Sequence, residues 1–182
     1  MKLIIHSLDT APARSRSTLE GIAGDLGFVP NLAATVAESP ALLAAFDGLR
    51  RAVAGTGLDP VHREVAGLAT GVAVGNAYGV AFHSTVLDRL GVTAADVDAM
   101  RAGDEPSDPT SAAVYALATA IVDGRGRVPV DVLDRARRGG LSDEAVLEIV
   151  AECTFAGLVG TVDNLAERVE LDAFLAPRAW TA

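Results

Sequence analysis

Helix start and stop signals recur along this chain, and no segment shows sustained two-residue alternation of polar and apolar residues. Ser39-Pro40 and Asp59-Pro60 each place a capping residue before a proline, an arrangement typical of a helix start. β-branched residues are dispersed among Ala and Leu. The pattern predicts an all-α fold. The expected helices are a short one that Asn31 can cap and others over about 13–26, 40–54, 60–74, 78–90, 94–100, 110–123, 129–138 and 141–170.

The composition indicates how these helices pack. Half of the 182 residues are hydrophobic but only 4% are aromatic, so the core must consist mainly of Ala, Val and Leu. Small side chains let helices approach closely, and they leave apolar faces that subunits can share. We therefore expect one compact multi-helix bundle over residues 1–182, in a chain of a length that suits a single domain. The same composition is compatible with a homo-oligomer.

The net charge, the cysteine content and the apolar runs limit the expected partners, disulfides and cellular location. The formal net charge is −9, and an acidic surface repels phosphate backbones, so nucleic acid is not an expected partner. Cys153 is the only cysteine, which precludes an intramolecular disulfide and fits a reducing compartment. The apolar run at the N-terminus is too short for a signal peptide, and we expect no membrane span. A cytoplasmic location is predicted.

Residues 63–84 place a carboxylate, Glu64, and an imidazole, His83, in otherwise apolar helices. Asn76, Gly79 and His83 share a helical face, and the glycine one turn from the imidazole could open space for a small ligand. Each signal also has a purely structural explanation: Glu64 as a surface residue paired with an arginine, His83 as a core histidine, and Gly79 as a close-packing position. The chain has three histidines and no zinc-binding motif, so neither a metal nor a cofactor is expected.

The same segment resembles the active-site pattern of alkylhydroperoxidase D-like proteins of the carboxymuconolactone decarboxylase superfamily. That pattern is Arg-Glu, eleven residues, Cys-x-Tyr-Cys, three residues and His. Arg63-Glu64, Tyr78 and His83-Ser84 match it without a gap, while its two cysteines fall on Asn76 and Gly79. Further similarity to the peroxidase-related branch lies in Gly27-Phe-Val-Pro-Asn-Leu, Ser39-Pro-Ala-Leu-Leu, Val86 to Gly91, Asp163-Asn-Leu and Leu171-Asp-Ala-Phe. The resemblance covers about residues 20–175.

The resemblance implies a chemistry that this chain has lost. In the family the second cysteine attacks a peroxide, Glu and His relay the proton through a water, and the first cysteine resolves the product as a disulfide. Asn76 and Gly79 can do neither step. A Glu64–His83 proton-transfer pair remains, and burial would bring the pKa of the carboxyl group closer to neutrality. Asn76, Tyr78 and Gly79 are the residues expected at the substrate.

Three functional hypotheses follow. The first is a cofactor-free acid–base enzyme that performs decarboxylation, isomerisation or lactone-type chemistry on a small organic acid with Glu64 and His83. The second is a catalytically inactive family member that binds a ligand or serves as an oligomeric scaffold. The third is residual peroxidase activity through Cys153, although an apolar helical setting favours a structural thiol there. The resemblance also implies a homo-oligomer, namely a dimer, trimer or hexamer.

Overall fold

The structure is a computed structural model that describes residues 1–181, and all regular secondary structure within them is helical. This confirms the all-α prediction. The elements are α1 (Ala13–Leu26), α2 (Asn31–Val36), α3 (Pro40–Ala54), α4 (Pro60–Ala73), α5 (Ala77–Arg89), α6 (Ala94–Ala102), α7 (Pro109–Asp123), α8 (Val130–Arg138), α9 (Asp143–Leu165) and the 3-10 helix η1 (Ala173–Arg178).

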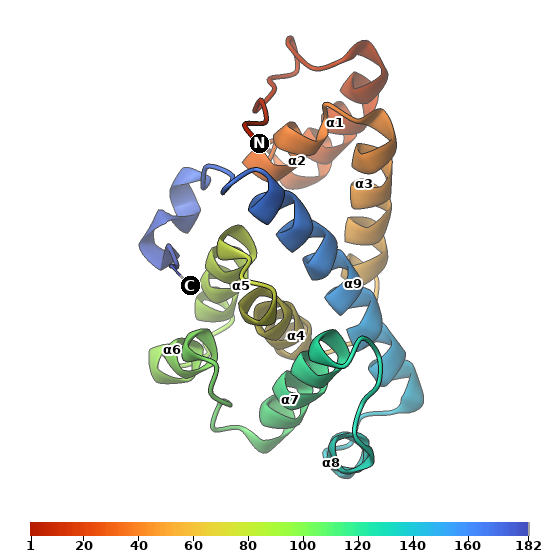
Figure 1. The fold of residues 1–182 in the computed structure, drawn as a ribbon, viewed down its shortest axis with the longest axis vertical. Helices are drawn as coiled ribbons and strands as arrows, with labels where there is room; N and C mark the ends of the chain where they lie inside the picture. The colour runs from red at the N-terminus through yellow and green to blue at the C-terminus, as the bar shows by residue number, and fades with distance from the viewer. Residues whose placement is uncertain (182) are drawn as a thin grey trace.

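Helix α4 lies at the centre of the bundle and packs against α5, α6, α7 and α9 (Figure 1). The long helix α9 crosses the molecule diagonally and also contacts α2, α3, α5 and α7. Helices α1 to α3 gather at the top of the view, whereas α6 and α8 lie toward the bottom. Because α4, α5 and α9 contact one another, their facing side chains meet in the interior.

Two apolar clusters form the core, and both consist mainly of aliphatic side chains, as the composition predicted. One cluster surrounds α4 and includes the fully buried Leu68, Leu117 and Ile149. The other joins α1 to α3 with the second half of α9 and includes the fully buried Leu19 and Leu43. Burial of such side chains is the main favourable contribution to folding.

The predicted helix boundaries are mostly correct, and the largest error concerns α9. This helix ends at Leu165, not near residue 170, because Glu167 and Arg168 adopt positive φ angles of 57° and 90°. The buried carboxylate of Asp163 accepts a hydrogen bond from the backbone N–H of Val169 at 2.8 Å and so fixes the turn. Gly160 does not break the helix, which continues through it.

The cap of α2 also differs from the prediction. Asn31 is the first helical residue, and its side chain makes no capping hydrogen bond. Its backbone N–H instead donates to the carboxylate of Asp172, at 3.2 Å to Oδ1. A carboxylate at a helix N-terminus compensates the unpaired N–H groups and the positive end of the helix dipole. The C-terminal segment thus supplies the cap across 141 residues of chain.

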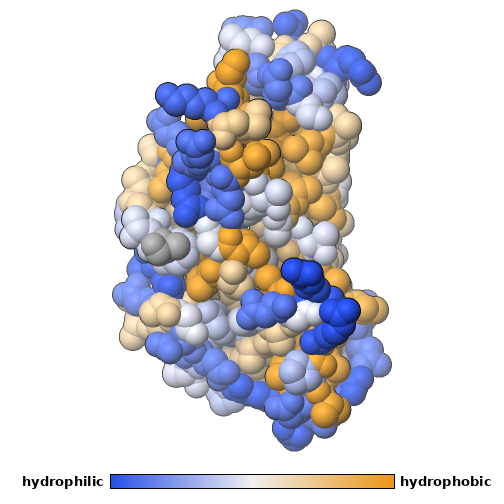
Figure 2. Space-filling view, in the orientation of Figure 1, coloured by the Kyte–Doolittle hydropathy of each residue, from blue (hydrophilic) through white to orange (hydrophobic). Residues whose placement is uncertain are grey.

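Helix α9 carries apolar residues on an exposed face. Leu147 and Leu165 are 69% and 56% exposed, and Val150 lies on the same side of the helix. Figure 2 shows hydrophobic surface in the upper centre and at the lower right of the face that α9 crosses in Figure 1. Among the described residues, α9 is also long and apolar enough to span a membrane by length and composition alone, which the sequence interpretation did not expect.

Candidate acid–base site

A tight helical hairpin formed by α4 and α5 positions the site. Asp59 caps α4 by accepting a hydrogen bond from the N–H of Val61, and Pro60 occupies the first helical position. Gly75, with a φ of 66°, turns the chain directly after α4, and Asn76 caps α5. The short turn makes the two helices antiparallel neighbours, so the first half of α4 faces the second half of α5.

Two glycines on α4 allow this close approach. A Cβ at Gly67 would lie only 2.2 Å from Cε1 of His83, and a Cβ at Gly71 would lie 3.2 Å from Cγ2 of Val80. The first separation is impossible for real atoms, so the imidazole occupies the space that a side chain at position 67 would need. Gly67, and not Gly79, is therefore the residue that makes room for the ring.

Glu64 and His83 meet in the interior between these helices. Oε2 of Glu64 lies 2.8 Å from Nδ1 of His83, and the two residues are 5% and 7% exposed. Nε of Arg63 donates to the other carboxylate oxygen at 3.2 Å. The structure thus brings the expected pair together, and burial shows that Glu64 is not a surface residue.

The electrostatics of this pair favour its ionised form. Burial alone would raise the pKa of Glu64, but the hydrogen bond and charge of His83, together with Arg63, outweigh burial and lower it. For His83, burial lowers the pKa, whereas the hydrogen bond and charge of Glu64 and the charge of Glu152 raise it above its ordinary value. The imidazolium of such a pair can donate a proton to a bound molecule, and the carboxylate can accept one from it.

A third ionisable side chain, Glu152 of α9, faces the opposite ring nitrogen. Its Oε1 lies 3.8 Å from Nε2 of His83, and the residue is only 3% exposed. Burial raises the pKa of Glu152 to about 7; the negative charge of Glu64 adds to this, and the charges of His83 and Arg63 oppose it. His83 therefore lies between two carboxyl groups from two different helices.

Asn76 and Gly79, the positions of the family cysteines, interact with each other. Oδ1 of Asn76 accepts a hydrogen bond from the N–H of Gly79 at 2.8 Å, and Asn76 is completely buried. A Cβ at Gly79 would lie 2.2 Å from Nδ2 of Asn76, so the amide fills the space beside the glycine. We predicted that Gly79 would open space for a ligand next to His83, but the structure gives that space to the helix cap.

Tyr78 points away from the Glu64–His83 pair. Its hydroxyl group donates to Asp172, and its backbone N–H donates to the buried carboxylate of Asp163. Burial and the neighbouring carboxylate raise the pKa of Tyr78 far above its usual range. The side chain links α5 to the C-terminal segment, and its predicted contact with a substrate is not part of this arrangement.

Cys153 is a core residue next to Glu152 in sequence. Burial raises the pKa of the Cys153 thiol to about 11, and the nearby Thr70 side chain only partly offsets this. The thiol packs in the cluster around α4. Because the reactive form of a cysteine is the thiolate, burial and the raised pKa disfavour reaction of this thiol at neutral pH.

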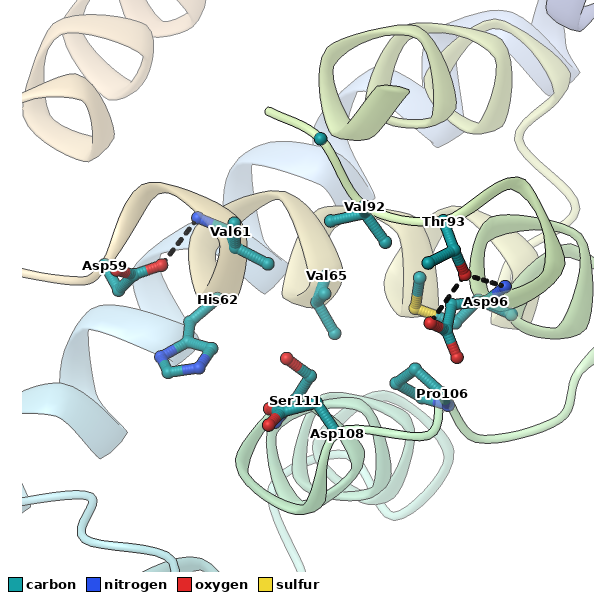
Figure 3. Close-up of a pocket in the computed structure, with 12 residues that line it drawn as sticks. Asp59, Val61, His62, Val65, Val92, Thr93, Asp96, Pro106, Asp108 and Ser111 are labelled. Atoms are coloured by element: carbon teal, nitrogen blue, oxygen red, sulfur yellow. Dashed lines mark hydrogen bonds between the residues drawn. The ribbon is translucent and has the colours of Figure 1, made fainter. Parts of the chain in front are cut away.

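A pocket of about 310 Å³ lies on another face of α4, between α4, α6 and the start of α7 (Figure 3). The residues that line it include His62, Val65, Asp59, Asp96 and Asp108. Each of these aspartates caps a helix or accepts a backbone hydrogen bond, so their charges have a structural explanation. Neither Glu64 nor His83 contributes to this pocket.

Within residues 1–181, no group of three or more His, Cys, Asp and Glu side chains has an arrangement suited to a metal ion. The donors of the site are one imidazole and two carboxyl groups, and one imidazole nitrogen is already bound to Glu64. Proton transfer is the chemistry that these side chains can perform without another group.

The fold is that of the alkylhydroperoxidase D core. A peroxidase-related protein from Ralstonia eutropha JMP134, described as an alkylhydroperoxidase AhpD core, is 22% identical over 96% of this chain and 93% of its own, with a TM-score of 0.81. A peroxidase-related protein from Silicibacter sp. TM1040 is 16% identical over 95% and 91%, with a TM-score of 0.75. The debrominase Bmp8, solved as a cysteine-to-alanine variant with 2,3,4-tribromopyrrole, is 22% identical over 96% of each chain, with a TM-score of 0.72.

A family model matches part of the sequence. Residues 40–121 match the carboxymuconolactone decarboxylase family. The matched segment contains Glu64, Gly67 and His83, but not Glu152. Among the curated proteins, none matches the chain.

Two residues of the site were not found from the sequence. Glu152 was part of a run described only as apolar and helical, although a lone carboxylate in such a run is itself a signal. Gly67 lies three residues after Glu64 and hence on the same face of α4, which indicates a close approach at that point. The sequence does not indicate which helix packs against this face of α4.

Proposed function

We propose that the protein is a cofactor-free acid–base enzyme that acts on a small organic acid, with Glu64 and His83 as its proton-transfer pair. The observation that carries this proposal is the buried 2.8 Å contact between the Glu64 carboxylate and Nδ1 of His83. A buried, preorganised carboxylate–imidazole pair is costly to maintain for stability alone, because removing two charges from water is unfavourable. Decarboxylation and isomerisation both require a proton to be delivered or removed at carbon, which such a pair can do.

The family and the related structures support a small-molecule site in this fold. The family is named for a decarboxylase, and the structure of the debrominase variant holds a tribromopyrrole. Both names concern small organic molecules. The half-buried Arg63 beside Glu64 adds a cation that suits a carboxylate group on the substrate.

The proposal is tested with Glu64→Gln and His83→Ala. Small organic acids and 2,3,4-tribromopyrrole are first screened for binding and turnover with the unsubstituted protein. Each substitution should then lower turnover by about 100-fold or more, which is typical for loss of a general acid or base. His62→Ala is the matched control, because His62 lies two residues before Glu64 but lines a pocket to which neither Glu64 nor His83 contributes. Normal turnover in both site variants would overturn the proposal.

A second candidate is a catalytically inactive, oligomeric binding protein. The exposed apolar face of α9, with Leu147 and Leu165, favours association with further copies of the chain. Light scattering of the unsubstituted protein, compared with Leu147→Glu, tests for the homo-oligomer. Ligand binding that persists in Glu64→Gln and His83→Ala, with no turnover in any of the three proteins, would favour this function over the acid–base enzyme.

Peroxidase activity through Cys153 is the weakest candidate. The two family cysteine positions hold Asn76 and Gly79, and the Cys153 thiol is buried with a raised pKa. Peroxide reduction that is lost in Cys153→Ser would be required to support it.

A further inference from the structure

Glu152 makes no side-chain hydrogen bond within residues 1–181, although it is almost completely buried. Buried carboxyl groups are normally paired or hydrogen-bonded, because an unpaired one is expensive to remove from water. The polar group that faces it is the Nε2 atom of His83, at 3.8 Å. The position of Glu152 is therefore not explained by a cap or a salt bridge to arginine.

We propose that Glu152 is a positioning residue of the site: it shares a proton with Nε2 of His83 and so holds the imidazole between two carboxyl groups. Glu64 fixes the ring through Nδ1, and Glu152 governs whether the opposite nitrogen carries a proton. This inference rests on the proposed function for its catalytic meaning, but its direct evidence is the arrangement of the three side chains.

The geometry favours this role over simple packing. Glu64, His83 and Glu152 come from α4, α5 and α9, which contact one another directly. At 3.8 Å, the two atoms lie just beyond hydrogen-bond distance, and a small shift of either side chain completes a hydrogen bond. A nonpolar residue of similar length would fill the same volume without the cost of burying a carboxyl group.

The surrounding charges define how the three groups titrate. The groups that act on Glu152 are His83 from α5 and Glu64 and Arg63 from α4. At low pH, Glu152 is neutral and the imidazolium is paired with Glu64. When Glu152 loses its proton, a second negative charge faces the ring, and the imidazolium persists to higher pH. Loss of this second charge should therefore make His83 easier to deprotonate.

The test follows His83 by NMR in protein labelled with 15N and 13C at histidine and at the glutamate carboxyl carbon. The chain has only three histidines, so His6→Gln and His62→Gln assign the remaining signal. We expect the titration midpoint of His83 to fall by roughly one pH unit in Glu152→Gln, as for loss of a nearby opposite charge. In the unsubstituted protein, the Glu152 carboxyl signal should titrate well above the range of an ordinary glutamate, and the His83 signal should respond in the same step.

Glu144→Gln is the matched control, because Glu144 lies on the exposed first turn of the same helix. It should leave the His83 titration unchanged. The proposal is overturned if the His83 midpoint is the same in Glu152→Gln as in the unsubstituted protein, or if the Glu152 carbon titrates like an exposed glutamate. Sequential assignment in uniformly labelled protein identifies the Glu152 carboxyl carbon among the nine glutamates without a substitution, so its titration decides the question even if the variant does not fold. Neither result depends on turnover, so failure here is distinct from failure of the acid–base proposal.

Discussion

The imidazole of His83 packs directly on the backbone of Gly67, and a Cβ there would stand 2.2 Å from Cε1 and 2.5 Å from Nε2. The ring and any side chain at position 67 are thus mutually exclusive. The glycine on α4 determines where the ring lies, and this position allows Nδ1 to reach Glu64.

Gly67→Ala should therefore disrupt the site more than the addition of a single methyl group suggests. The new methyl group must displace the imidazole or separate α4 from α5, and overpacking of this kind typically costs about 1–3 kcal/mol. The free energy of unfolding, measured with urea, should fall by that amount. The NMR signals of His83 should move because its contact with Glu64 is strained or broken.

Gly24→Ala on α1 is the control for this substitution. A Cβ at Gly24 meets no atom within 4 Å, so alanine there should leave stability unchanged or raise it by up to about 1 kcal/mol through helix propensity. A Gly67→Ala protein as stable as the parent, with unshifted His83 signals, would show that the helix pair is looser than the structure indicates.

The raised pKa of Glu152 predicts a pH dependence of stability. The folded protein holds a proton on Glu152 up to about pH 7, whereas the unfolded chain releases it near the ordinary value of 4.5. Since the folded state binds more protons in this range, stability falls as the pH rises from about 5 through 7. The total loss is on the order of 3 kcal/mol. The raised pKa of His83 acts in the same direction at higher pH, because its stabilisation is lost as the imidazolium deprotonates.

Glu152→Gln should remove the Glu152 contribution. Its free energy of unfolding should rise relative to the unsubstituted protein between pH 5 and pH 8, as urea titrations at several pH values would show. Glu144→Gln, on the exposed first turn of α9, should differ from the parent by a constant amount. A Glu152→Gln curve parallel to that of the parent would mean that Glu152 is ionised throughout this range.

The sequence predicts the helices well because their ends are local features. Ser39, Asp59, Thr93 and Ser142 each cap the helix that follows through the side chain, as their types suggest. Asn31 was misassigned because the true cap, Asp172, is far away in the chain and is brought near only by tertiary folding. Local propensity contains no information about such contacts.

The residues of the site also divide into those that local sequence predicts and those that only tertiary folding brings together. The Glu64–His83 pair was predictable because the family spacing fixes both residues on one hairpin. Asn76 and Gly79 were expected at a ligand because the family has cysteines there, but an asparagine before a helix is also a strong cap, and this local preference determines its contacts. Glu152 lies on α9, which is too far from α4 and α5 in sequence for a local pattern to connect it with Glu64 and His83.

Tyr78→Phe distinguishes a structural role from a role in substrate binding. Removal of the hydroxyl group leaves the Asp172 carboxylate without one of its donors, and loss of a hydrogen bond to a charged group typically costs about 1–3 kcal/mol. Urea unfolding should show this loss, while the NMR signals of His83 and any turnover stay unchanged. Tyr115→Phe is the matched control: its hydroxyl group donates to the backbone carbonyl of Met100, a neutral acceptor, so the loss should be smaller. A large fall in turnover for Tyr78→Phe would instead place Tyr78 at the substrate.

The Cys153 thiol should react slowly in the folded protein. With its pKa raised to about 11, the thiolate fraction at pH 8 is roughly 100-fold lower than for an ordinary cysteine, and packing in the core restricts access further. Mass spectrometry after treatment with iodoacetamide should therefore show modification at least about 100-fold slower in the folded protein than in urea. Peroxide in the presence of dimedone should trap no sulfenic acid at Cys153. Rapid modification or a dimedone adduct in the folded protein would reveal an activated thiol, and the peroxidase hypothesis would then take precedence over proton transfer by Glu64 and His83.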